Sequence, residues 1–138
     1  MRIALTLTLF LALPAKAWTF DPVPLCTLSQ LAPDLQATVT SDPGSGLYAL
    51  SLLRPEGWPE AAVFSIRFGS GLTISTNRHV IEGTTLSVTD TGFGNVLSGM
   101  EAGGIATALL GALELPIDMT GAPPAVAEFR ACPATPTA

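Results

Sequence analysis

Residues 36–53 read QATVTSDPGSGLYALSLL, and this stretch decides the fold class. Residues 36–41 and 47–53 are short runs with the apolar and polar alternation that is typical of strands with one buried face. The five residues between them, DPGSG, are turn formers. The stretch therefore predicts an antiparallel β-hairpin.

The same pattern continues toward the C-terminus. Residues 63–68 (VFSIRF) place both phenylalanines and the isoleucine on one face. A Gly-Ser-Gly turn then leads to a second alternating run at residues 72–76 (LTIST), so a second hairpin is expected. Further strands are expected at residues 85–89, 105–110 and 112–117.

Two segments favour helices instead. Val96, Leu97 and Met100 follow a glycine-rich turn at helical spacing, which predicts a short helix near residues 95–102. Two prolines open the second segment, and apolar residues recur there every third position, which predicts a closing helix near residues 123–132. Short strands without strand–helix–strand alternation predict an α+β fold that is mainly antiparallel β and β-sandwich-like.

The N-terminus has the pattern of a secretory signal peptide at residues 1–17. One arginine precedes the apolar run IALTLTLFLAL, and a small-residue A-x-A site precedes Trp18. We expect an exported protein, periplasmic or secreted, with no membrane span in its mature chain. Its mature part would be a single antiparallel β-rich domain at residues 18–132 and a disordered tail at residues 133–138.

Export changes the meaning of the two cysteines. In an oxidising compartment Cys26 and Cys132 would most simply form one disulfide that joins the start of the domain to its end. Two separate buried thiols are the alternative. A catalytic thiol is less favoured because neither cysteine has a histidine near it in the sequence.

Composition and motifs exclude several classes of function. The chain has 138 residues, a formal net charge of −5 and a pI of about 4.5, so it has no basic surface for nucleic acid. Nucleotide-binding glycine motifs and closely spaced metal ligands do not occur in the sequence. We therefore expect no cofactor, no metal, no nucleotide and no nucleic-acid partner.

The remaining candidate for catalysis is the pair His79 and Asp90. A histidine and an aspartate are two of the three members of a hydrolase triad, and a small secreted hydrolase with an unidentified nucleophile is one hypothesis. The sequence lacks the G-x-S-x-G motif, however, and a histidine at a strand end satisfied by local hydrogen bonds is the simpler interpretation. Glu56 and Glu60 form a second possible pair, with an exposed turn as its alternative.

Two aromatic residues in glycine- and proline-rich loops, Trp58 and Phe93, are candidate binding residues. Trp58 has an alternative role as a cap on the core. Since a hydroxyl-rich β domain can present loops or sheet edges to a partner, our first hypothesis is a non-enzymatic exported binding or accessory module for an unknown protein or small molecule. A protein inhibitor of a secreted enzyme is a further possibility.

Two stretches are more distinctive than packing requires, residues 72–79 (LTISTNRH) and residues 90–100 (DTGFGNVLSGM). Together with Cys26, residues 54–59 (RPEGWP) and residues 129–132 (FRAC), they resemble a group of small exported alphaproteobacterial proteins of unknown function. In its order of elements the chain is also similar to the invasion-associated locus B family of secreted β-rich proteins. Neither resemblance implies a catalytic residue.

Overall fold

The computed structural model describes residues 17–132, and it has ten strands and two helices in this range. Every strand pair is antiparallel, as the sequence pattern predicts. The fold class is thus confirmed as mainly antiparallel β with two short helices. Most of the expected signal peptide and the whole expected tail lie outside the described residues.

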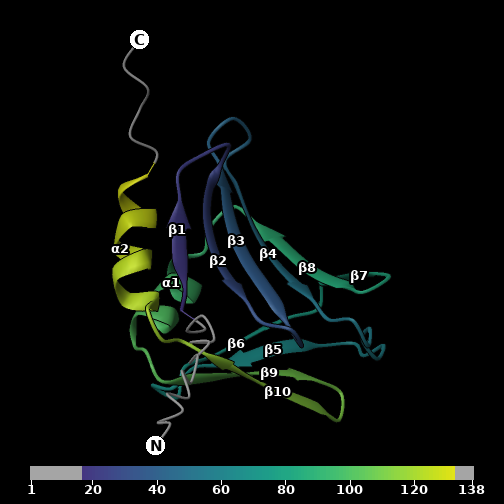
Figure 1. Ribbon diagram of the computed structural model, residues 1–138. Coiled ribbons are helices and arrows are strands. Elements are labelled where there is room, and N and C mark those ends of the chain that lie inside the picture. Colours follow the sequence, from purple (N-terminus) through teal and green to yellow (C-terminus); the bar gives the residue numbers. More distant parts are fainter. Residues whose placement is uncertain (1–16, 133–138) are drawn as a thin grey trace, which may run out of the picture.

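The strands form two sheets whose directions cross (Figure 1). The large sheet has the order β1-β2-β3-β4-β8-β7, and the small sheet has the order β10-β9-β5-β6. The large sheet consists of β1 (Thr19–Asp21), β2 (Cys26–Leu31), β3 (Gln36–Asp42), β4 (Leu47–Leu53), β7 (Val80–Glu82) and β8 (Thr85–Asp90). The small sheet consists of β5 (Phe64–Arg67), β6 (Thr73–Thr76), β9 (Ile105–Leu110) and β10 (Leu113–Asp118).

Both predicted hairpins form. β3 and β4 pair from Asp42 opposite Leu47, and the Asp42 carboxylate accepts a 2.9 Å hydrogen bond from the Gly44 N–H within the turn. In the second hairpin β5 pairs with β6, and the alternation places Phe64 and Ile66 in the core. The inward side chains of the two sheets meet in one hydrophobic cluster.

The two helices cover one side of this core. α1 (Gly94–Glu101) and α2 (Ala122–Ala131) contact each other, and α2 also packs on β1 and β2 (Figure 1). Arg130 of α2 forms an ion pair with Glu101 of α1. α2 ends one residue earlier than predicted, because Cys132 is already in an extended conformation. Among residues 17–132, neither helix combines the length and apolarity that crossing a bilayer requires.

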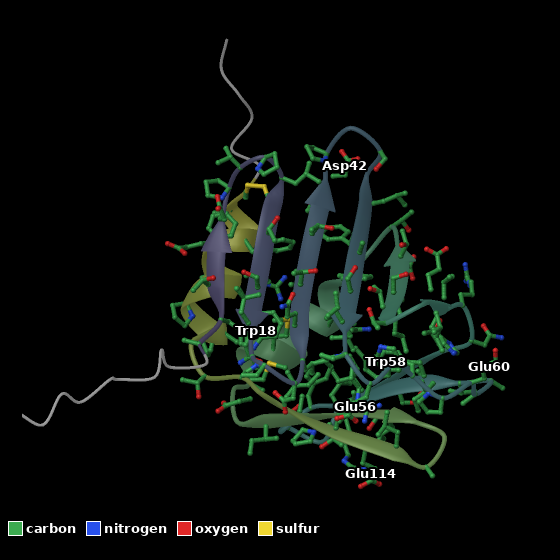
Figure 2. The ribbon with its side chains drawn as sticks, turned by 45° about the vertical axis from the view of Figure 1, so that its right-hand side comes forward. Trp18, Asp42, Glu56, Trp58, Glu60 and Glu114 are labelled. Atoms are coloured by element: carbon green, nitrogen blue, oxygen red, sulfur yellow. A yellow bond between two sulfur atoms is a disulfide. The ribbon has the colours of Figure 1, made fainter. Side chains whose placement is uncertain are left out.

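The predicted disulfide is confirmed. Cys26 and Cys132 are bonded with their Cα atoms 6.2 Å apart, across 106 positions of sequence. Figure 2 shows the sulfur–sulfur bond at the end of α2 that lies beside the start of β2. The bond therefore fixes the closing helix to the large sheet.

Candidate functional site

A depression with a volume of about 780 Å³ lies between the two sheets. We call it the intersheet cleft. Its most buried lining residues are Leu50 of β4, Phe64 and Ile66 of β5, and Phe93 of the loop before α1, each less than 8% exposed. These side chains give the cleft an apolar floor.

The walls of the cleft come from two separate segments of the chain. Residues 74–78, from β6 and the loop after it, form one wall. Residues 88–90 at the end of β8 and residues 92–96 at the start of α1 form the other. The two distinctive stretches of the sequence, residues 72–79 and 90–100, are thus brought together around one depression.

The rim of the cleft is polar and carries one charge of each sign. Among residues 17–132, Arg78 and Asp90 are the only charged residues that line it. The Asp90 carboxylate accepts a 2.6 Å hydrogen bond from the Thr91 main-chain N–H, which keeps it at the end of β8. An apolar floor beneath a few polar groups is the usual composition of a ligand site, and the volume is within the usual range of about 300–1,000 Å³.

Phe93 is part of the core as well as of this floor. Its ring stacks on Tyr48 of β4 with ring centroids 5.6 Å apart, and only 4% of the residue is exposed. A ligand in the cleft would contact a ring that this packing holds in place. The prediction that Phe93 binds a partner is therefore restricted to an occupant of the cleft, since the residue does not project from the loop.

Trp58 lies away from the cleft. Its indole N–H donates a 3.0 Å hydrogen bond to the Thr84 main-chain oxygen, and Arg54 lies over its ring at 5.9 Å. Arg54 also pairs with Glu56 at 2.7 Å, whereas Glu60 is exposed farther along the loop (Figure 2). These contacts join the loop after β4 to the β7–β8 turn, which supports the interpretation of Trp58 as a cap on the core.

His79 and Asp90 occupy different places. His79 Nε2 is 2.9 Å from the Ala61 main-chain oxygen, and its ring packs near Phe64 with centroids 6.2 Å apart. It lines a shallow depression with Glu60 and Ile81, while Asp90 lines the intersheet cleft. Within residues 17–132, the hydrogen bonds of neither side chain involve the other. The Nε2 contact fits the simpler interpretation of His79 only in part, because among residues 17–132 the buried Nδ1 has no hydrogen-bond partner.

The described residues hold no group of three His, Cys, Asp or Glu side chains that could bind a metal ion. Family models, curated proteins and solved structures were each searched, and none of the three searches found a match. The resemblance to small exported alphaproteobacterial proteins and to the invasion-associated locus B family thus stays a prediction.

Sequence reasoning did not identify the cleft as a site. Its walls include Ile74, Val88 and Val96, which are half-buried apolar residues of the kind that any core contains. The available signal was the pair of distinctive stretches that supply these walls. Only the crossing of the two sheets shows that the stretches share a site.

Proposed function

We propose that this protein is an exported binding module that holds an apolar group of its partner in the intersheet cleft. The observation that supports this function is the apolar floor beneath a rim with one positive and one negative side chain, Arg78 and Asp90. The floor residues come from β4, from β5 and from the loop before α1, and all of them belong to the packed core. The cleft is thus preformed, and an occupant would not have to order it.

Export is the second part of the proposal. The disulfide between Cys26 and Cys132 is compatible with an oxidising compartment, where such bonds persist. The N-terminal signal pattern supports the same location. Trp18, the first residue after the expected cleavage site, is buried in the core, so the folded domain would begin directly at the processed end.

A fluorescent amphiphile tests the cleft. 1-Anilinonaphthalene-8-sulfonate should bind the folded wild type with a saturable rise in fluorescence. The Ile74→Glu variant places a carboxylate on the cleft wall, next to the apolar part of the dye. We expect about tenfold weaker binding, equivalent to about 1.4 kcal/mol, because the charge must lose solvent when the dye binds.

Thr73→Glu is the matched control, since it adds the same charge to the same strand. Thr73 is exposed and does not line the cleft. This variant should bind the dye as the wild type does, and near-ultraviolet circular dichroism should show native packing in all three proteins. Equal dye binding by wild type and Ile74→Glu would exclude the cleft as the binding site.

A further inference from the structure

The small sheet ends beside the cleft in a strand with a free edge. β6 is the terminal strand of this sheet in the described part of the chain, and its residues Ile74 to Thr76 line the cleft. Ser75 is one of these lining residues. Its side chain, however, contacts β5, because its hydroxyl lies 2.7 Å from the Ser65 hydroxyl. Since that side chain is engaged with β5, it is the main chain of β6 that borders the cleft.

The other three sheet edges carry features that discourage strand pairing. β10 has Pro116 between two exposed acidic residues, and β7 is three residues long and contains Glu82. β1 is also three residues long, and α2 packs against it. Proline, charge, short length and coverage by a helix are the usual ways in which proteins block an edge. β6, with the sequence TIST, contains neither a charge nor a proline.

The register shows which main-chain groups of β6 are free. Phe68 donates a 2.8 Å hydrogen bond to the Leu72 oxygen, so this pair is a hydrogen-bonded one. Hydrogen-bonded and non-hydrogen-bonded pairs alternate along antiparallel strands. Arg67 opposite Thr73 and Ser65 opposite Ser75 are therefore non-hydrogen-bonded pairs. The N–H and C=O groups of Thr73 and Ser75 point away from β5, toward the free edge.

The side chains of β6 alternate between its two faces with the same two-residue period as its free main-chain groups. Ile74 and Thr76 are half-buried and line the cleft, while Thr73 and Ser75 are exposed. A further strand beside β6 would lie about 4.8 Å away, with every second side chain on the cleft side. Those side chains would enter the space above the apolar floor.

We propose that β6 is a docking edge for an extended peptide segment of a partner protein, which adds as an antiparallel strand and places alternate apolar side chains in the cleft. The proposal rests on the proposed function and specifies its partner. The segment is uncharged, because Arg78 and Asp90 leave the rim without net charge. An acidic segment would be repelled, since residues 17–132 contain four arginines and eleven acidic side chains.

The test uses a capped heptapeptide of alternating threonine and valine, labelled with fluorescein and followed by fluorescence anisotropy. Two N-methylated versions keep every side chain. In an antiparallel addition with valines in the cleft, the threonine N–H groups face β6 and the valine N–H groups face away. Methylation of the threonine nitrogens should abolish binding, whereas methylation of the valine nitrogens should leave it unchanged.

The protein side of the test uses Ser75→Pro, which removes a free-edge N–H and keeps the β5–β6 hydrogen bonds. Ser75→Ala is the matched control, because both variants lose the Ser65 contact. We expect Ser75→Pro to weaken peptide binding by about tenfold, as expected for one or two lost hydrogen bonds. Ser75→Ala keeps this N–H and should bind the peptide about tenfold more tightly than Ser75→Pro does. Near-ultraviolet circular dichroism should show native packing in both variants.

The outcomes separate the two proposals. Dye binding without peptide binding, or equal binding of both methylated peptides, would overturn strand addition and leave the proposed function intact. Absence of both dye and peptide binding would overturn both. A dimer in sedimentation that Ser75→Pro dissociates would show that the edge pairs with a second copy of this chain, which also contradicts a peptide partner.

Discussion

The indole N–H of Trp18 donates a 2.9 Å hydrogen bond to the main-chain oxygen of Asp118, across 100 positions of sequence. The Gln30 side chain of the large sheet donates to the same oxygen at 2.6 Å. Trp18 precedes β1, and Asp118 ends β10, so the bond joins the two sheets at the base of the large one (Figure 2). These two bonds tie the end of β10 to the large sheet and to the residue before it.

Trp18→Phe should destabilise the domain by about 1–2 kcal/mol, because it removes a largely buried donor and part of a buried ring. Urea unfolding followed by circular dichroism measures this difference. Trp58→Phe also removes an indole hydrogen bond, but Trp58 is only half-buried. This variant should therefore lower the free energy of unfolding by less than Trp18→Phe does. A larger loss for Trp58→Phe would contradict the role given to Trp18.

Replacing both cysteines by serine should lower the free energy of unfolding by about 4–5 kcal/mol, the chain-entropy value for a loop of about 100 residues. The closed loop spans the 106 positions between Cys26 and Cys132. Chemical denaturation of the wild type and the double variant measures the difference. Intact wild type should also gain two daltons on reduction, and an unchanged mass would disprove the bond in the isolated protein.

Two glycines of α1 should respond in opposite directions to alanine. A Cβ at Gly99 would lie 2.4–2.6 Å from the Phe68 ring, so Gly99→Ala should destabilise the domain by about 1–3 kcal/mol. A Cβ at Gly94 meets nothing within 4 Å, and Gly94→Ala should stabilise the domain by up to about 1 kcal/mol. Thermal unfolding of the two variants checks both signs, and equal effects would contradict the close approach of α1 to Phe68.

His79 should contribute to stability through its contact with Ala61. His79→Ala removes the Nε2 hydrogen bond and should lower the free energy of unfolding by about 1–2 kcal/mol. Dye binding in the cleft should be unchanged, because His79 does not line it. An esterase and glycosidase screen of both proteins tests the alternative. If the wild type were active and His79→Ala lost this activity without losing stability, the result would favour the hydrolase hypothesis.

Much of the local structure could be predicted because its signals are local. The alternation of residues 63–68 and the turn at residues 42–46 each specify a strand or hairpin within a short window. β2 was not predicted, although CTLSQL alternates, because its inward positions include a polar residue. Gln30 is buried, and its bond to the distant Asp118 oxygen compensates for that burial.

The cleft could not be predicted for a related reason. The strand order places β8 beside β4 and β9 beside β5, and these pairings join segments dozens of residues apart. Ile74 and Val88 belong to different sheets, and the local sequence pattern does not show how these two sheets face each other or that the two residues line one cavity. The same holds for His79 and Asp90, which are near in sequence and line different depressions.

Chemical-shift mapping tests the binding site most directly. In nitrogen-15 spectra of the folded domain, addition of 1-anilinonaphthalene-8-sulfonate should shift the amide signals of residues 74–78 and 88–96, on the two walls of the cleft. Signals from β10, at the far edge of the small sheet, should stay in place. Shifts confined to surfaces outside the cleft, or saturable dye binding without wall shifts, would contradict a binding module built around the intersheet cleft.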